Sequence, residues 1–492
     1  MDWALKRFVL CAASFWLVFA ALTTNLPAND RRQNVLLIYL DDMNDWISLL
    51  DPSSPIKTPN LERLARKGTL FSKAYCMSAA CNPSRVATLT GLRPTTSGVY
   101  GNKTDWRAAL PSRKTIMQKF QTAGYQVFGA GKIFHHHLDG AFHDEASFDV
   151  FQPMRKQLYP PKKLNGAPKY GSRNTDWGSW PNREEDSIDF GTASFCIDVL
   201  KSAQVRRQKA KASGDAIEPF FLACGIFKPH SPFFSPAKYQ RLGKREEMHM
   251  PLRNEADWDD LPSGAANLLR SKKWFWDGMQ KLDTSRSGAY QEFVAAYAAC
   301  CRFADAQVGR VLKALEDTEA AEDTIVILLS DHGFHLGEKD HIEKFALWEK
   351  SNHIPMIIVA PEVTTAGSVC DQPVDCSVVF PTLLDLCDLP ADPSCDGQSL
   401  RPLLHSPEGT WKQPALMTYG RGNHALRNSR WRYIRYSDGS QELYDHAKDP
   451  NEWRNLANSH DPLHQDAMAE LRVWLPETEA LEVMDLNPKQ AR

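Results

Sequence analysis

Residues 34–42 read Asn-Val-Leu-Leu-Ile-Tyr-Leu-Asp-Asp, an uninterrupted apolar run that ends in two carboxylates. Such a run is typical of a strand buried on both faces, as in a parallel sheet covered by helices. A second run, residues 324–331, reads Thr-Ile-Val-Ile-Leu-Leu-Ser-Asp and is followed by His332. Because ligands of open α/β sheets bind at the carboxyl ends of the strands, we expect these polar side chains to lie close together.

The rest of the chain continues this alternation of strands and helices. Further strands are expected at residues 71–76, 126–130, 220–227 and 354–359, and helices from residues 58 and 83 onward and at 115–123, 290–315 and 377–386. The alternation predicts an α/β fold with a large, mainly parallel sheet flanked by helices on both faces. After about Met417 the pattern changes to short alternating strands near 427–436 and 442–445, which predicts a small C-terminal antiparallel sheet.

The N-terminus predicts export. Lys6 and Arg7 precede an apolar run from Phe8 to Leu22, so residues 1–28 fit a secretory signal peptide. The run is shorter than the roughly 20 apolar residues of a membrane span, so we expect no span in the mature chain. An uncleaved anchor is the alternative. The destination would be periplasmic, extracellular or lysosomal, depending on the organism.

Size, charge and cysteine content set further limits. The 492 residues are enough for two or three domains, and the net charge of -2 argues against a nucleic-acid partner. Export permits disulfides. Cys387 and Cys395 flank a Pro- and Asp-rich loop and are a plausible pair.

Residues 81–91 read Cys-Asn-Pro-Ser-Arg-Val-Ala-Thr-Leu-Thr-Gly. A cysteine here could be a buried free thiol, half of a disulfide or an ordinary thiol nucleophile. The Cys-x-Pro-Ser-Arg run closed by Thr-Gly resembles the signature of type I sulfatases of the alkaline phosphatase superfamily. In that family a maturation enzyme oxidises the cysteine to formylglycine before the chain folds. The resemblance implies that the nucleophile is the hydrate of a formylglycine at Cys81. Arg85, one helical turn further on, can reach back over it.

The polar ends of the two apolar runs are candidate metal ligands. Asp41, Asp42, Asp331 and His332 supply three carboxylates and one imidazole, which suit a hard cation better than zinc. Two aspartates after a strand are, by themselves, as often a helix cap or a turn. The resemblance implies one divalent cation, calcium first and magnesium as the alternative, with Cys81 as a further ligand.

A Gly-Lys…His element follows the strand predicted at residues 126–130. By resemblance, Lys132 would bind sulfate oxygens, and His135 would take the proton whose removal restores the aldehyde. His135, His136 and His137 are consecutive, so the sequence offers rivals. The Lys-x-x-His spacing of the family favours His135.

Two further motifs complete the expected site. His230, in Lys-Pro-His, is the candidate general acid for the leaving alcohol. Lys344 aligns with the second sulfate-binding lysine of the family, and Lys339 and His341 are rivals in the same loop.

The motifs together resemble the iduronate-2-sulfatase branch over nearly the whole mature chain. This implies a catalytic α/β domain at residues 29–416, with an insertion at about 150–215, and an α+β subdomain with a helix at residues 417–492. The implied function is a secreted sulfuric ester hydrolase acting on a sulfated mono-, oligo- or polysaccharide. The alternatives are a phosphate or phosphonate ester hydrolase of the same superfamily and an unmodified, non-catalytic protein that binds sulfated glycans.

Overall fold

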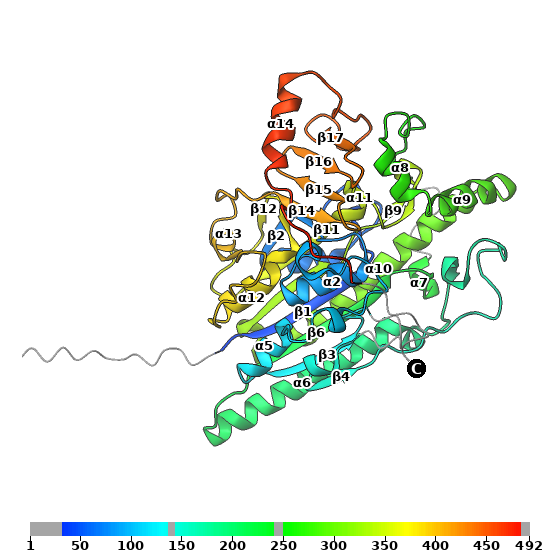
Figure 1. The fold of residues 1–492 in the computed structure, drawn as a ribbon. Helices are drawn as coiled ribbons and strands as arrows, with labels where there is room; N and C mark the ends of the chain where they lie inside the picture. The colour runs from blue at the N-terminus through cyan, green and yellow to red at the C-terminus, as the bar shows by residue number, and fades with distance from the viewer. Residues whose placement is uncertain (1–31, 136–142, 241–248, 484–492) are drawn as a thin grey trace, which may run out of the picture.

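The computed structural model describes residues 32–135, 143–240 and 249–483, and a nine-stranded sheet lies at its centre (Figure 1). In spatial order the strands are β12 (Ser368–Cys370), β2 (Thr69–Tyr75), β11 (His353–Val359), β8 (Thr324–Ser330), β1 (Asn34–Asp41), β6 (Phe220–Pro229), β3 (Gln126–Gly131) and β4 (Val150–Gln152), with β13 (Val374–Asp375) also paired to β2. Strand β11 is antiparallel to β2 and β8, and the other pairs are parallel. The predicted mainly parallel sheet is confirmed.

Helices cover both faces of this sheet. Core residues of α1 (Pro59–Ala65), α6 (Ile188–Ser213) and α10 (Ala289–Glu316) pack with Leu36 and Ile38. Core residues of α2 (Cys81–Thr90), α5 (Ile116–Thr122) and α12 (Val379–Leu386) pack with Val35 and Leu37 on the other face. Alternate side chains of β1 therefore enter different cores, which explains why its sequence is apolar at every position from Val35 to Leu40.

The carboxyl ends of four central strands lie side by side. Leu40 of β1 pairs with Ser330 of β8, Asp41 pairs with Pro229 of β6, and Gly131 of β3 pairs with Gly225 of β6. A Cβ at Gly131 (φ 77°) would lie 2.1 Å from the Gly225 carbonyl oxygen. Glycine is needed there so that the chain can turn beside β6 and deliver Lys132 to the sheet edge.

The C-terminal part forms the predicted small antiparallel sheet. Its strands are β14 (Ala415–Thr418), β15 (His424–Arg427), β16 (Trp431–Arg435) and β17 (Gln441–Asp445), and helix α14 (Pro462–Arg472) packs against it (Figure 1). Residues 427–436 are not one strand. The Asn428 side chain accepts hydrogen bonds from the N–H groups of Arg430 and Trp431, and this turn separates β15 from β16.

Shorter elements connect these layers. They are the helices α3 (Pro94–Ser97), α4 (Trp106–Ala109), α7 (Ala237–Gln240), α8 (Ser263–Leu269), α9 (Lys273–Ser285), α11 (Glu349–Asn352) and α13 (Arg401–His405), and the strand pairs β5 (Trp177–Ser179) with β7 (Phe233–Ser235) and β9 (His335–Leu336) with β10 (Ile342–Glu343). The expected insertion at 150–215 contains β4, which belongs to the central sheet, and α6, which packs on one face of that sheet. The segment between them, residues 153–187, is the part that belongs neither to the sheet nor to its helical layer.

The predicted Cys387–Cys395 disulfide is wrong, because all ten cysteines among the described residues are free thiols. Cys387 is buried at the end of α12, whereas the Cys395 thiol accepts a hydrogen bond from Arg113. The predicted signal peptide at residues 1–28 lies outside the described residues. Within the part that the structure describes, no helix is long and apolar enough to cross a membrane.

Candidate active site

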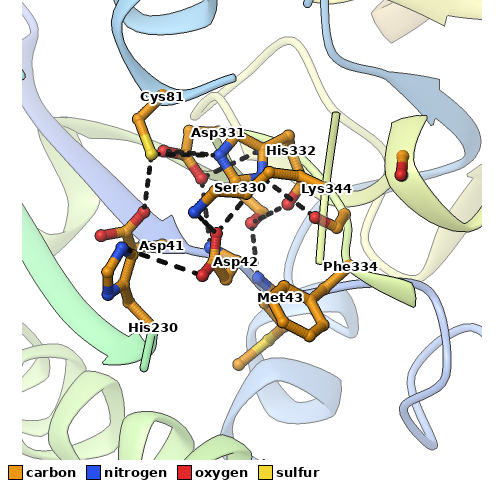
Figure 2. A network of polar contacts seen from close by, with 12 residues as sticks. Asp41, Asp42, Met43, Cys81, His230, Ser330, Asp331, His332, Phe334 and Lys344 are labelled. Carbon is orange, nitrogen blue, oxygen red and sulfur yellow. Dashed lines mark hydrogen bonds and ion pairs between the residues drawn. The ribbon is translucent and has the colours of Figure 1, made fainter. Parts of the chain in front are cut away.

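Cys81 is the first residue of α2 and is almost completely buried, with 1% of its surface exposed. Its Sγ lies 3.2 Å from His332 Nε2 and 3.8 Å from Asp41 Oδ1 (Figure 2). Lys132 Nζ lies 3.5 Å from the same sulfur atom. The start of α2 therefore meets the ends of β1, β3 and β8. The N-terminal end of a helix favours negative charge, which suits an anionic substrate group at this position.

The three predicted carboxylates converge beside Cys81. Asp41 ends β1, and Asp42 follows in the left-handed region (φ 67°), which turns the chain at the end of the strand. The Asp42 N–H donates to Asp331 Oδ1 at 3.2 Å, and the His332 N–H donates to the same oxygen at 3.0 Å. These bonds join the ends of β1 and β8.

Arg85 is completely buried and holds three strand ends together. Its Nε donates to Asp331 Oδ2 at 2.8 Å, and its guanidinium lies 3.5 Å from Asp41 Oδ1. It also donates to the carbonyl oxygens of Lys132 at 2.5 Å and Ile133 at 3.1 Å. Arg85 is therefore not a surface residue, and its role in catalysis stays a prediction.

Two buried lysines neutralise the carboxylates. Lys132 Nζ lies 2.5 Å from Asp41 Oδ2, and Lys344 Nζ lies 2.8 Å from Asp42 Oδ1. Burial works to raise the pKa of Asp41, but the charges of Lys132, Arg85 and Lys344 outweigh it and hold that pKa well below its usual range. The site therefore has anionic and cationic sides that are both withdrawn from water.

Lys339 and His341, the alternatives to Lys344, have their partners outside the group formed by Cys81 and the three aspartates. Lys339 Nζ pairs with Asp257 at 2.9 Å and bonds the Glu452 carbonyl, on the side of the C-terminal sheet. His341 Nε2 lies 2.6 Å from the Lys344 carbonyl oxygen, so it supports the loop that carries Lys344.

The ring nitrogens of two histidines have distinct partners. His332 Nδ1 lies 3.0 Å from the Gly333 carbonyl, and His230 Nδ1 lies 2.6 Å from the Ser231 carbonyl. A carbonyl can only accept, so Nδ1 carries the proton in both rings and Nε2 faces the cluster. Burial lowers the pKa of His230 to about 4, although Asp41 opposes the shift.

His135 also reaches the nucleophile position. Its side chain hydrogen-bonds Cys81, and burial lowers its pKa. Its neighbours His136 and His137 lie outside the described residues, so the sequence-based choice among the three histidines stays a prediction.

The cluster fits a hard divalent cation. Ligand atoms of Asp41, Cys81, Asp331 and His332 all lie within 4.8 Å of one another, and Asp42 belongs to an overlapping group. Asp42 Oδ2 is buried and has no hydrogen-bond partner among the described residues. A buried carboxylate oxygen without a donor is costly unless it binds a cation. The donor set is therefore suited to calcium or magnesium.

Two residues that hold the site together were not predicted from the motifs. Asp189 accepts from the N–H groups of Phe227 and Lys228 at 2.7 and 3.0 Å, and so fixes the end of β6 before His230. Ser84 Oγ donates to the Asp331 carbonyl at 2.5 Å. Ser84 could have been predicted from the sequence, because it belongs to the Cys-x-Pro-Ser-Arg run. Asp189 lies in α6, far from any of the motifs in the sequence, and no local pattern indicates its role.

Comparisons with known proteins show the family to which the chain belongs. The Sulfatase family profile matches residues 33–389, and the N-sulphoglucosamine sulphohydrolase C-terminal profile matches residues 337–480. The chain is 34% identical to a sulfatase of Formosa agariphila, over 91% of this chain and 87% of that protein. It is 28% identical to the iduronate 2-sulfatase of Mus musculus, over 80% of this chain and 75% of that protein.

Among solved structures, the phosphonate monoester hydrolase of Agrobacterium radiobacter superimposes with a TM-score of 0.68 at 22% identity, covering 90% of this chain and 96% of that one. The architecture is thus the alkaline-phosphatase-like α/β fold. The chain belongs to the sulfatase family and is a sulfatase, a hydrolase of sulfuric esters.

Proposed function

We propose that this sulfatase removes sulfate from a sulfated carbohydrate and that residue 81 acts as a formylglycine formed from Cys81. The position of the Cys81 thiol carries this proposal, because its Sγ lies within 3.8 Å of an aspartate, a lysine and a histidine. An ordinary thiol nucleophile needs one base and a donor for the oxyanion. It does not need three buried carboxylates beside it, whereas metal-assisted attack on sulfur does.

The metal ligands would be Asp41, Asp42, Asp331 and His332, together with residue 81. The proposed ion is calcium, with magnesium as the alternative, because oxygen ligands dominate the set. When bound, the cation would lower the pKa of a hydroxyl group at residue 81 and offset negative charge on the ester. The Gly333 carbonyl orients His332 for this role by fixing its Nδ1 proton.

The cations Arg85, Lys132 and Lys344 would bind the sulfate oxygens. All three side chains are buried and come from different elements, so they can surround a tetrahedral anion. Each also pairs with an aspartate of the cluster, which offsets the cost of burying its charge.

Proton transfer is assigned to two histidines. His230 would protonate the leaving alcohol from Nε2, which lies 4.0 Å from Asp42 Oδ2; for this step the ring must carry a second proton on Nε2, beside the one that Nδ1 donates to the Ser231 carbonyl. The Lys228 ammonium holds its loop by donating to the carbonyl oxygens of His230 and Pro232 at 2.9 and 2.6 Å. His135, beside residue 81, would take the proton that accompanies release of sulfate.

The substrate class follows from similarity. The iduronate 2-sulfatase relative supports a sulfated uronic acid as the sugar, and the family profiles support a sulfate ester. The basic and apolar pattern of residues 1–28 supports export before the enzyme meets such a glycan.

A competition assay tests this function. Purified enzyme is given matched sulfate and phosphate monoesters of one sugar, and release of each anion is measured. The proposal predicts a higher kcat/KM for the sulfate ester. A higher kcat/KM for the phosphate or phosphonate ester would contradict it, and tight binding of the sulfated sugar without release would favour a non-catalytic role.

A further inference from the structure

Four half-buried residues form a group beside Lys344, which we call the rim cluster: Lys272, Glu343, Phe345 and Tyr419. Lys272 Nζ lies 3.8 Å from the centroid of the Phe345 ring and 3.8 Å from Glu343 Oε2. The Tyr419 and Phe345 ring centroids are 5.6 Å apart. The reaction steps described above use none of these four side chains.

The backbone ties the rim cluster to the nucleophile. The Phe345 N–H donates to the Ala79 carbonyl at 3.0 Å, two residues before Cys81. The N–H of Thr418, the residue before Tyr419, donates to the Met77 carbonyl at 2.9 Å. Both aromatic side chains therefore belong to segments that are fixed to the loop entering α2.

The backbone on either side of Lys344 has an unusual conformation. Glu343 (φ 102°) and Phe345 (φ 74°) both have positive φ, although neither is glycine. Such conformations cost free energy in residues with a Cβ, and they occur mostly where a site requires a particular side chain in a particular place. A loop that served only to present Lys344 would be expected to use glycine at these positions.

The charges of the rim cluster remain accessible. The side chains of Lys272 and Glu343 are 28% and 25% exposed, and their 3.8 Å separation is beyond hydrogen-bonding distance. The Lys272 ammonium is thus not committed to Glu343 by a hydrogen bond. It lies instead over an aromatic ring, where it can still accept an anionic partner.

We propose that the rim cluster binds the sugar that carries the sulfate ester and that Lys272 pairs with a second anionic group on that sugar. This inference rests on the proposed function. Phe345 and Tyr419 would contact the apolar face of the sugar ring, and Glu343 would accept hydrogen bonds from its hydroxyl groups. A uronate carboxylate and a second sulfate share the required chemistry.

The test uses Lys272→Met, Lys272→Arg and the matched control Lys273→Met. Lys273 is the adjacent residue, and its Nζ pairs with Asp277 at 2.9 Å. Each enzyme is assayed on two substrate pairs. The first pair is a uronic acid 2-sulfate glycoside and its carboxyl methyl ester. The second pair is a hexosamine carrying N- and 6-sulfates and its N-acetyl, 6-sulfate counterpart.

One substrate pair will differ in the anion that Lys272 binds. For that pair, Lys272→Met should lower the ratio of kcat/KM for the dianionic substrate to kcat/KM for the monoanionic one by about tenfold, because one charge-assisted contact is lost. Lys272→Arg should retain most of the ratio, and Lys273→Met all of it. The pair that responds identifies the anion as carboxylate or sulfate. An unchanged ratio in both pairs would overturn the role of Lys272.

The same preparations are also assayed with an aryl sulfate. If the wild-type enzyme releases sulfate from the aryl ester but from none of the four sugars, the rim-cluster proposal and the carbohydrate substrate both fail, while the sulfatase chemistry stands. If no sulfate ester is cleaved although the protein is folded and carries formylglycine, the proposed function itself fails.

Discussion

The Nε2 atom of His332 lies 3.2 Å from the Sγ atom of Cys81. The Gly333 carbonyl accepts the proton of Nδ1, so Nε2 is the ring atom that faces residue 81. A proposed metal ligand and the proposed nucleophile are therefore immediate neighbours, and changes at either should affect both metal binding and turnover.

Loss of the cation should abolish activity and lower thermal stability. Removal of the proposed cation would leave the buried carboxylates of Asp41, Asp42 and Asp331 without it, and Asp42 Oδ2 has no hydrogen-bond partner among the described residues. At a calcium concentration of about 100 Kd, the bound ion should stabilise the fold by about 2.7 kcal/mol. Chelation followed by differential scanning calorimetry measures this effect.

His332→Ala should weaken calcium affinity by more than the roughly 10- to 100-fold that loss of an outer-shell partner costs. Calorimetric titration of the metal-free enzyme gives the affinity. Full activity in excess chelator, or an unchanged calcium affinity in His332→Ala, would contradict the assigned metal site.

His230 should matter most for poor leaving groups. If its Nε2 protonates the departing alcohol, His230→Gln should lower kcat/KM for a sugar sulfate by about 100-fold or more. The loss should be much smaller for 4-nitrophenyl sulfate, whose leaving group needs no proton. Equal losses on the two esters would assign His230 to sulfate binding or structure instead.

Lys339 and Lys344, which lie on either side of β10, should have different roles. Lys344→Met should lower kcat/KM by about 100-fold, because Lys344 contributes its charge within the cluster. Lys339→Met should chiefly lower stability, because it leaves Asp257 buried without its partner. Steady-state kinetics and urea unfolding of both variants separate the roles, and the reverse pattern would show that Lys339 is the sulfate-binding lysine.

A buried ion network should make the fold sensitive to acid. Arg432 of the C-terminal sheet pairs with Glu349 and lies 2.6 Å from Glu452 Oε1. Burial works to raise the pKa of Glu349, but Arg432, His446 and Arg427 outweigh it and hold that pKa well below its usual range. A carboxylate with a depressed folded-state pKa stabilises the fold fully above its unfolded-state pKa, and this contribution fades as pH falls toward the folded-state value.

Glu349→Gln should therefore lower the unfolding free energy by about 3–5 kcal/mol at neutral pH. Below about pH 4.3 the difference from wild type should narrow by up to about 1.4 kcal/mol per pH unit. Urea unfolding as a function of pH measures it, with the exposed Glu408→Gln as control. A difference that stays constant down to pH 3 would rule out this coupling.

The parts of the fold that could be predicted from the sequence are those in which a local residue pattern is compatible with a single kind of structure. Residues 35–40 of β1 and 325–329 of β8 are all apolar because both strands are buried on both faces, and the polar residues at their carboxyl ends indicated the site. Helix α6 was less visible, because its second half, residues 201–213, is rich in Lys, Arg and Gln and resembles a surface insertion.

The rim cluster could not be predicted from local patterns. Lys272 and Tyr419 meet Phe345 only through the folded chain, and the positive φ values of Glu343 and Phe345 occur at residue types that give no warning of them. The spacing of Cys387 and Cys395 was equally uninformative, since it says nothing about the directions of their side chains.

Mass spectrometry of the peptide that contains residue 81, from enzyme with measured sulfatase activity, tests the central claim most directly. The account predicts formylglycine at this position, in a fraction of molecules that rises in proportion to specific activity. It also predicts no turnover in Cys81→Ala and normal turnover in the control Cys395→Ala. Fully active enzyme with an unmodified cysteine at residue 81 would contradict the account.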